Sequence, residues 1–419
     1  MKNIRTYSNY SLLLSLIIPF FILGPFLPDL IVSLSALVFL VYVVKKKKFY
    51  YFNKKPLIIF FIFCIYFILV SIFVAENTLL SFESSLFYFR IGIFACLIWH
   101  LIEQDKKILS YFYYVLLICF SFLIFDGYFQ FFFGFNIIGL PLISDRISSF
   151  FGKELIMGSY LSRLFPLLFA LFLLKKKKGN FEVYYIGGLF ILIDTLIYIS
   201  GERASFFFLN LSTLFIIILI KKYQIFRLFT FVCALVLIAG LTFSYKKLAD
   251  RMIFSTLNSL GFLKENQKQN IFSPIHDSLI KTAYNMFLDK PLVGHGPKMF
   301  RVICKNEKYR IDDYSCDTHP HNFYVQLLAE TGIIGFSFLF SAFAYVLYCA
   351  YRQFKSIFLR QKRYLTDYQV CLLAGILITV WPLTTNGNFF HNWLMIVYSL
   401  PVGFYLHSIY GKNRNNISF

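Results

Sequence analysis

Residues 29–48 read DLIVSLSALVFLVYVVKKKK, an apolar run followed directly by four lysines. A helix needs about 20 predominantly apolar residues to cross the hydrocarbon core of a bilayer. Lysine and arginine next to such a helix are typical of its cytoplasmic end. This stretch therefore predicts a membrane-spanning helix whose carboxyl end faces the cytoplasm.

The composition of the whole chain agrees with a membrane protein. Of its 419 residues, 58% are hydrophobic, 21% are aromatic and only 15% are charged, whereas about a quarter of the residues of a soluble domain are charged. The formal net charge of +20 would suit a nucleic-acid-binding protein, but the positive charges lie in short clusters between apolar runs. We therefore expect contact with membrane lipid and no nucleic-acid partner.

Similar apolar runs recur along the chain. The twelve expected spans are 11–27, 29–44, 56–75, 85–102, 108–131, 156–174, 182–199, 204–220, 225–243, 323–349, 368–385 and 390–409. The basic clusters all follow even-numbered spans, at 45–48, 106–107, 175–178, 221–222, 352–363 and 412–414. This charge bias places both termini in the cytoplasm. The sequence thus predicts an all-α, multi-pass integral membrane protein with about twelve transmembrane helices.

Two of the outward-facing connections are long, 132–155 and 244–322. The chain accordingly divides into spans one to nine at 1–243, one large outer loop at 244–322, and spans ten to twelve at 323–419. The large loop holds twelve Lys and Arg against eight Asp and Glu. Long loops cross the membrane largely regardless of charge, and an anionic ligand would account for the excess.

The large loop contains a helix signal. Proline suits the first turn of a helix, so Ser273 and Pro274 mark a start. Apolar residues then recur at helical spacing: Leu279, Ile280, Ala283, Met286 and Phe287. Pro291 and Gly294 end the pattern. We expect an amphipathic helix on the membrane surface or over the bundle, with a role confined to packing as an equal alternative to substrate binding.

Cysteine usage fits this topology. Six of the eight cysteines lie in or beside spans, whereas Cys304 and Cys316 are the extramembrane pair. An oxidising compartment would allow these two to join. We expect a disulfide between them.

Chemistry is expected on the outer side. The chain has no phosphate-binding P-loop motif and no paired Asp-x-Asp metal motif, so any reaction must use energy already present in its substrate. Polar residues that carry chemistry gather in the outward-facing segments: His276, His295, His319, His321, His391, Arg146, Arg203, Lys298 and Arg301.

Arg203 is the most informative cation. It lies in Ser-Gly-Glu-Arg-Ala-Ser, 200–205, where one span turns into the next. A cation at that depth is costly unless it is paired or binds an anion. The alternative is a pair with Glu202, or a side chain that reaches the interface. Arg146 has a similar alternative in the adjacent Asp145.

His321 is the best single candidate for acid–base chemistry. Pro320 suits a first helical turn, which would place His321 at the amino terminus of the tenth span. The helix dipole there lowers the pKa of an imidazole and keeps it neutral, as a general base requires. Gly332 and Gly335 follow at helical spacing and would form a packing stripe below it. The alternative is a capping histidine above a helix-packing stripe, and His319 is expected to be a cap.

A glycine-rich turn precedes this helix. Residues 291–297 read PLVGHGP, and Lys298 and Arg301 follow. Glycines let a backbone approach a ligand closely. The turn could cradle a phosphate, although a glycine-rich turn alone is a weak signal.

Three motifs together resemble the O-antigen ligase and polymerase superfamily. The tenth span begins with His321-Asn322, followed after nine residues by Gly-Ile-Ile-Gly, 332–335. The segment 291–297 resembles that superfamily's Pro-Leu-x-Gly-x-Gly turn, and 200–204 resembles its Ser-x-Arg-Gly/Ala element. The twelve spans and the large loop before the tenth agree with the resemblance.

The resemblance implies a bacterial inner-membrane enzyme whose active face is periplasmic. Ligases of this kind transfer a glycan from undecaprenyl diphosphate to a sugar hydroxyl of lipid A-core, and polymerases transfer it to another lipid-linked repeat. They do so without metal, nucleotide or other cofactor. Carried over, Arg203 would bind the diphosphate and His321 would activate the acceptor hydroxyl. The remaining residues expected to contact substrate are Arg146, Lys298, Arg301, His276, His319 and Asn322.

One position departs from the superfamily. Many members have arginine early in the loop helix, where this chain has His276. The phosphate contact is then expected to be weaker, pH-dependent, or moved to Lys281. We favour a ligase, with a polymerase as the alternative within the family. A transporter is the alternative of another class, for which Asp126 and Asp194 are the mid-span candidates.

Overall fold

The computed structural model describes residues 2–262, 271–414 and 418–419, and its regular secondary structure there is helical, with two isolated β-bridges and no strand. The helices up to the long outer segment are α1 Lys2–Ser15, α2 Ile17–Leu23, α3 Phe26–Lys45, α4 Lys55–Phe73, α5 Thr78–Leu86, α6 Phe89–Gln104, α7 Lys107–Phe133, α8 Met157–Leu174, α9 Asn180–Ile199, α10 Arg203–Leu219 and α11 Gln224–Ser244. The remainder are α12 Lys246–Ala249, the π-helical turn η3 Asp250–Phe254, α13 Ser255–Ser259, α14 Pro274–Asp289, α15 Phe300–Ile303, α16 Phe323–Phe358, α17 Asp367–Thr379 and α18 Asn392–Tyr410.

The expected all-α architecture is confirmed for the described residues. Among the described residues, nine helical stretches are long and apolar enough to cross a membrane. Shorter apolar helices at Tyr7–Leu23, Arg203–Leu219 and Asp367–Thr379 occupy the positions of the other three expected spans. The number of crossings therefore stays a prediction, because these three fall short of a full span by length.

Burial separates central helices from peripheral ones. The most apolar windows of the α5–α6 stretch, α8 and α18 are 72–83% buried, whereas those of α11 and α16 are 22% buried. Helix α8 packs on α17, and α6 packs on α18, at the centre of the bundle. The outer helices present apolar side chains such as Ile118, Val236 and Phe243 at the surface, as lipid contact requires.

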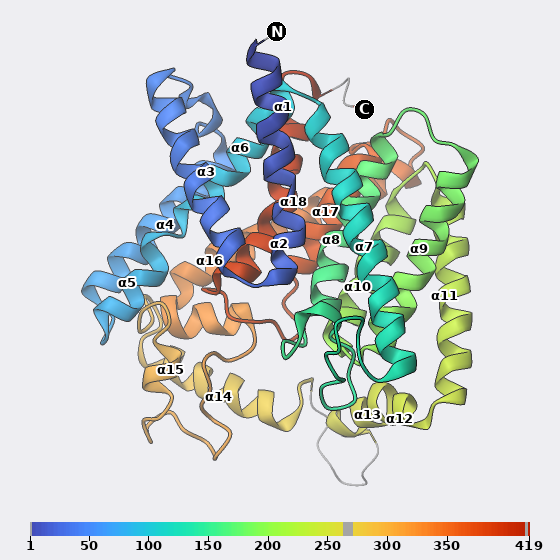
Figure 1. Ribbon diagram of the computed structural model, residues 1–419. Coiled ribbons are helices and arrows are strands. Elements are labelled where there is room, and N and C mark those ends of the chain that lie inside the picture. Colours follow the sequence, from blue (N-terminus) through green and yellow to red (C-terminus); the bar gives the residue numbers. More distant parts are fainter. Residues whose placement is uncertain (1, 263–270, 415–417) are drawn as a thin grey trace.

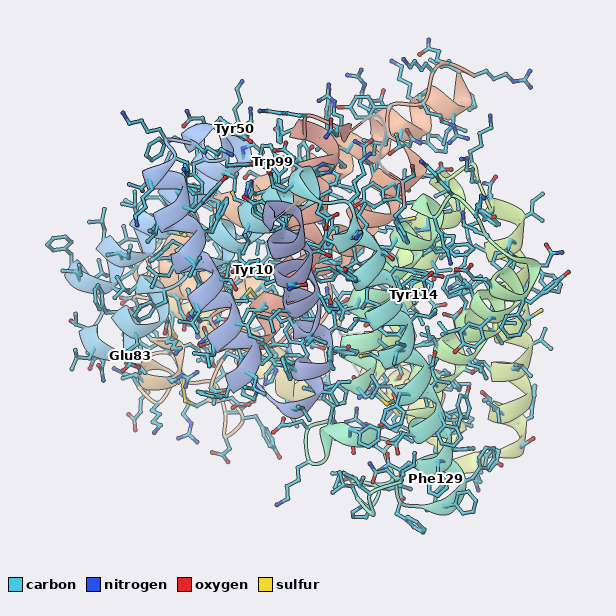
Figure 2. All side chains as sticks on the ribbon, turned by 45° about the horizontal axis from the view of Figure 1, so that its top comes forward. Tyr10, Tyr50, Glu83, Trp99, Tyr114 and Phe129 are labelled. Carbon is cyan, nitrogen blue, oxygen red and sulfur yellow. A yellow bond between two sulfur atoms is a disulfide. The ribbon has the colours of Figure 1, made fainter. Side chains whose placement is uncertain are left out.

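The two ends of the bundle differ. Both chain termini lie at one end, and α12 to α15 lie at the other (Figure 1). Tyr50 and Trp99 lie close together, with ring centroids 6.3 Å apart, and Phe129 lies well away from them (Figure 2). The candidate site residues belong to the end that carries α12 to α15.

Candidate active site

Helix α14 is the longest described helix of the 244–322 region, which we call the outer segment. It is the helix predicted from Ser273-Pro274, and it packs over the bundle rather than standing apart. Its buried face contributes Leu279, Ala283 and Met286 to a small core shared with Phe300 and Ala329. Beside this core, Cys304 and Cys316 form the expected disulfide.

The glycine-rich turn docks onto a break in α16. Gly332 has φ 63° and ψ −168°, so the helix is interrupted there. The N–H groups of His295 and Gly296 donate to the carbonyls of Ala329 and Glu330 at 3.1 and 2.7 Å, and the N–H of Ile333 donates to the carbonyl of Pro291 at 2.8 Å. The turn thus satisfies backbone groups that an interrupted helix leaves without partners.

Two glycines make this contact possible. A Cβ on Gly332 would lie 2.2 Å from the carbonyl oxygen of Leu292, and one on Gly294 would lie 2.4 Å from the backbone of Thr331. Two sequence interpretations are therefore wrong. The N–H groups of His295 and Gly296 are used by α16 and cannot cradle a phosphate. Gly332 does not continue a packing stripe below His321, because it ends that helical segment.

The amino terminus of α16 is capped by Asn322, not by either histidine. Its Oδ1 accepts from the N–H groups of Tyr324 and Val325 at 3.0 and 3.2 Å. His321 precedes the cap and has φ 55°, in the left-handed region. This conformation is uncommon for a non-glycine residue and marks a position that its surroundings hold in place. The prediction of His321 in the first helical turn, with His319 as a cap, is corrected accordingly.

Buried Arg163 contacts His321 indirectly, through Asn386. The carbonyl of His321 accepts from the N–H of Asn386 at 2.7 Å. The side-chain oxygen of Asn386 accepts from Nη2 of Arg163 at 3.1 Å, and Arg163 also donates to the carbonyl of Ile378. The guanidinium of Arg163 lies 4.2 Å from the ring centroid of Tyr398. The sequence analysis missed both Arg163 and Asn386, because neither belongs to a motif.

The imidazole of His321 has a carboxylate partner that the sequence analysis also missed. Nε2 of His321 lies 3.2 Å from Oδ2 of Asp317. Burial raises the pKa of the Asp317 carboxyl, but the N–H of Thr318 and the His321 imidazole outweigh this and hold that pKa below its ordinary value. An ionised Asp317 favours the tautomer with the proton on Nε2. The lone pair then lies on Nδ1, which has no hydrogen-bond partner among the described residues.

Three histidines meet here, and we call His276, His319 and His321 the histidine trio. The ring centroids of His276 and His321 are 5.2 Å apart, and those of His319 and His321 are 4.1 Å apart. Burial lowers the pKa of His276, and His321 and Arg203 lower it further. Burial likewise lowers the pKa of His319 to about 3, helped by His321 and Arg301. His276 and His319 are therefore neutral at physiological pH.

Three arginines lie on the His276 side of the trio, and we call Arg146, Arg203 and Arg251 the arginine cluster. Arg203 is exposed and donates to Oγ1 of Thr256 at 3.3 Å. Burial lowers the pKa of Arg251, and its neighbours Arg146 and Arg203 lower it further. Arg251 was missed because it stands alone beyond the ninth span. Among the described residues, none of the three has a carboxylate within ion-pair distance.

The alternative pairings for Arg203 and Arg146 are both wrong. Glu202 is buried and accepts from the N–H groups of Gly158 and Ser159 at 2.7 and 3.1 Å. Asp145 instead pairs with Lys247, at 3.1 Å. Arg203 and Arg251 consequently keep their charge available for an anion, whereas the nearby carboxylate of Glu202 partly offsets the charge of Arg146.

Glu202 anchors the turn that carries Arg203. Besides the start of α8, its carboxylate accepts from Oγ of Ser205 at 2.8 Å. Burial raises the pKa of Glu202, and the hydrogen bonds from Gly158 and Ser205 oppose that rise. Gly201 has φ 72°, and a Cβ there would lie 2.4 Å from Nε of Arg251. The turn therefore brings Arg251 and Arg203 to the same place.

Lys298 and Arg301 lie on the His319 side of the trio, and we call them the second basic cluster. Burial lowers the pKa of Lys298, and Arg301 lowers it further. Lys298 has φ 60°, so it shares with His321 an uncommon backbone conformation. By contrast, Lys281 pairs with Asp277 at 2.6 Å on the outer face of α14, which gives no support to a phosphate contact moved to Lys281.

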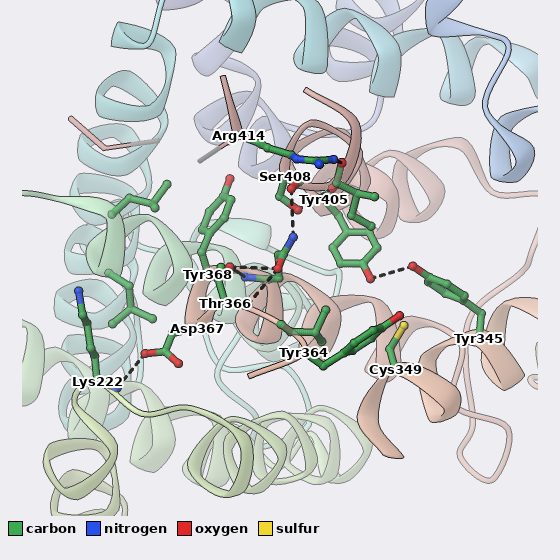
Figure 3. Close-up of a pocket in the computed structure, with 15 residues that line it drawn as sticks. Lys222, Tyr345, Cys349, Tyr364, Thr366, Asp367, Tyr368, Tyr405, Ser408 and Arg414 are labelled. Carbon is green, nitrogen blue, oxygen red and sulfur yellow. Dashed lines mark hydrogen bonds between the residues drawn. The ribbon is translucent and has the colours of Figure 1, made fainter. Parts of the chain in front are cut away.

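A cavity at the opposite end of the bundle has no part in this arrangement. It has a volume of about 630 Å³, and its lining includes Tyr345, Cys349, Asp367, Tyr405 and Arg414 (Figure 3). Asp367 accepts the N–H of Lys222 there at 2.7 Å. None of the candidate residues lines this cavity.

Comparison with known proteins finds a match to a family model over the segment that holds most of these residues. Residues 187–340 match the family model described as O-antigen ligase. The teichuronic acid biosynthesis protein TuaE of Bacillus subtilis (strain 168) is 24% identical over 119 residues, which is 28% of this chain and 24% of that relative. The match thus spans about a quarter of the relative's length. The segment that matches the family model includes Arg203, His276 and His321, so the residues of the candidate site lie in the part of the chain that is similar to the O-antigen ligase family.

Proposed function

We propose that the protein is an O-antigen ligase, which transfers a glycan from undecaprenyl diphosphate to a sugar hydroxyl of lipid A-core. The observation that carries this proposal is the pair of His321 and Asp317, with Nδ1 unbonded, beside three arginines without carboxylate partners. In this proposal the reaction occurs at the periplasmic face of the bacterial inner membrane, and both termini are cytoplasmic. It uses no metal or cofactor.

The arginine cluster supports the donor half of the reaction. Negative charge grows on the diphosphate as the sugar–phosphate bond breaks, and preorganised cations stabilise it at that moment. Nε of Arg251, in η3, donates to the carbonyl of Gly201 at 3.1 Å, and Glu202 anchors the turn that carries Arg203. In this proposal Arg251 takes the place of the arginine that many members of the superfamily have at the position of His276.

His321 supports the acceptor half. Nδ1 accepts the proton of the acceptor hydroxyl as that oxygen bonds to the anomeric carbon, and the anomeric carbon–phosphate oxygen bond breaks. The resulting imidazolium is stabilised by Asp317, which is 3.2 Å from Nε2. Undecaprenyl diphosphate leaves with its charge on the arginine cluster, and the proton then passes to solvent. The sugar–phosphate bond supplies the driving force.

A polymerase is the second candidate function. It would use the same donor site and base, and its acceptor would be another lipid-linked repeat. The relative TuaE is named for teichuronic acid biosynthesis and not for ligation. We therefore retain the polymerase as an alternative.

A transporter has less support. Both mid-span carboxylates that suggested one have structural partners. Asp194 pairs with Arg227 at 3.1 Å, with Thr213 bonded to the same guanidinium. Asp126 accepts from the N–H of Ile137 and from Oγ of Ser149, and so holds the 132–155 connection.

Purified full-length protein tests the proposal directly. It is supplied with a glycan on undecaprenyl diphosphate, together with either lipid A-core or additional lipid-linked repeats. Transfer to lipid A-core is the expected result. Lengthening of the lipid-linked glycan alone would instead assign the polymerase, and translocation without any transfer would overturn both.

A further inference from the structure

The histidine trio separates two basic clusters that lie on different elements. The arginine cluster is carried by the 132–155 connection, the start of α10 and η3. The second basic cluster is carried by the glycine-rich turn and α15. In Figure 1, α12 and α13 lie on one side of this end of the molecule, α15 lies on the other, and α14 lies between them. Two anionic groups could therefore be held at once, one on each side of His321.

The second basic cluster combines partial burial with the lack of an ion pair to any described residue, and buried Glu330 is a carboxylate that acts on its charge from nearby. Three other cations of the same segment pair with carboxylates: Lys281 with Asp277, Lys308 with Asp289, and Arg310 with Asp313. Among the described residues, Lys298 and Arg301 have no such partner. Lys246, Lys290 and Lys305 form no ion pair with a described residue either, but these three are exposed to solvent. Partial burial of a cation without an ion pair costs free energy, and a bound anion would reduce that cost.

Two buried nitrogen atoms, one in the second basic cluster and one in the histidine trio, have no hydrogen-bond partner among the described residues. They are Nε of Arg301 and Nε2 of His319. His319 is buried, with 9% of the residue exposed. Its ring lies 4.1 Å from that of His321. An anion that bonded Arg301 and His319 would consequently lie beside the base.

The second basic cluster is also held rigidly. The N–H of Phe300, between Lys298 and Arg301, donates to Oε1 of buried Glu330 at 2.9 Å. The turn before it is bonded to α16, and the disulfide of Cys304 follows it. Cations fixed in advance lose little conformational entropy when a ligand binds, which suits a specificity site.

We infer that Lys298, Arg301 and His319 bind an anionic substituent of the acceptor glycan, a phosphate or a carboxylate, while the arginine cluster binds the donor diphosphate. This inference rests on the proposed function, since it assigns the two sides of one transfer site. It predicts that the enzyme selects acceptors that carry negative charge close to the accepting hydroxyl.

Binding tests this inference without requiring turnover. Full-length protein in nanodiscs is titrated with undecaprenyl diphosphate as the donor probe. The saturated protein is then titrated with glucose 6-phosphate, glucuronate or glucose. We expect both anionic sugars to bind the saturated protein, and glucose to bind about tenfold or more weakly. Comparison of the two anions shows whether phosphate or carboxylate is preferred.

Variants assign the two clusters. Lys298→Gln with Arg301→Gln should weaken glucose 6-phosphate binding about tenfold or more and leave undecaprenyl diphosphate binding unchanged. Arg203→Gln should do the reverse. Lys305→Gln, an exposed cation of the same segment, is the matched control, and equal melting temperatures exclude misfolding.

Two results would overturn the inference. One is equal binding of glucose and glucose 6-phosphate. The other is a loss of undecaprenyl diphosphate binding in Lys298→Gln/Arg301→Gln, which would assign these residues to the donor. A failure of the proposed function is distinguishable, because it would show as absent glycan transfer by a protein that still binds both probes.

Discussion

Nε2 of His321 lies 3.2 Å from Oδ2 of Asp317, four residues earlier in the chain. In many acid–base sites a carboxylate fixes the tautomer of a histidine and stabilises its protonated form. The same relationship at His321 directs the lone pair of Nδ1 to the acceptor side. Asp317 is thus part of the site even though no motif contains it.

Loss of the Asp317 carboxylate should slow transfer. In Asp317→Asn, the amide can donate to Nε2 and so favour the tautomer with the proton on Nδ1. We expect an initial rate of glycan transfer that is lower by about 10²- to 10⁴-fold, the range for loss of general base catalysis. Asp313→Asn, in the same segment but paired with Arg310, is the control. An unchanged rate in Asp317→Asn would remove the carboxylate from the mechanism.

Arg163 should act as a positioning residue. Arg163→Met removes the donor to Asn386, and Asn386 then no longer fixes the carbonyl of His321. We expect the turnover number to fall while binding of undecaprenyl diphosphate persists. Asn386→Asp keeps the acceptor oxygen for Arg163 and should be affected less than Asn386→Leu. A matched loss of donor binding and turnover would assign Arg163 to general stability instead.

The glycine contacts between the turn and α16 should be intolerant of a side chain. Gly332→Ala places a Cβ 2.2 Å from the Leu292 carbonyl and requires a positive φ. We expect destabilisation of at least ~1 kcal/mol, the scale of backbone strain alone, seen as a lower melting temperature. Gly188→Ala, in α9 with nothing within 4 Å of the added Cβ, should not destabilise and is expected to raise helix propensity. Equal melting temperatures for the two variants would contradict the close backbone contact.

Acid should destabilise the outer segment through His319. Its pKa is about 3 in the folded protein and about 6.5 when unfolded, so the unfolded chain binds a proton that the native protein does not. Stability therefore rises with pH between about 3 and 6.5, by up to ~1.4 kcal/mol per pH unit for one proton. The melting temperature should fall between pH 7 and pH 4, and should fall less in His319→Gln. A parallel fall in both proteins would show that His319 is not the group responsible.

The sequence predicted the helices well because their signals are local. Apolar length and lysine clusters place α3, and the Ser273-Pro274 start places α14. The site was less predictable. Arg203 and His321 stood out through motif and position, but some contacts that position them join distant parts of the sequence. Glu202, next to Arg203, accepts from the start of α8, and the N–H of Asn386 donates to the carbonyl of His321.

The prediction of a packing stripe through Gly332 was wrong for a related reason. Helical spacing placed Gly332 below His321 on the assumption of an unbroken helix. The contact with Leu292, some forty residues earlier, breaks that helix, and the conformation of Gly332 alone allows it. Tertiary contacts of this kind leave no periodic signal in the chain.

The central claim is that His321 and the arginine cluster catalyse glycan transfer from undecaprenyl diphosphate. The most direct measurement is single-turnover transfer to lipid A-core by wild-type protein, His321→Ala and Arg203→Ala, each inserted in the membrane to the same extent. The account predicts transfer by wild type, with no detectable product from either variant over the same interval. Full transfer by His321→Ala or by Arg203→Ala would contradict it.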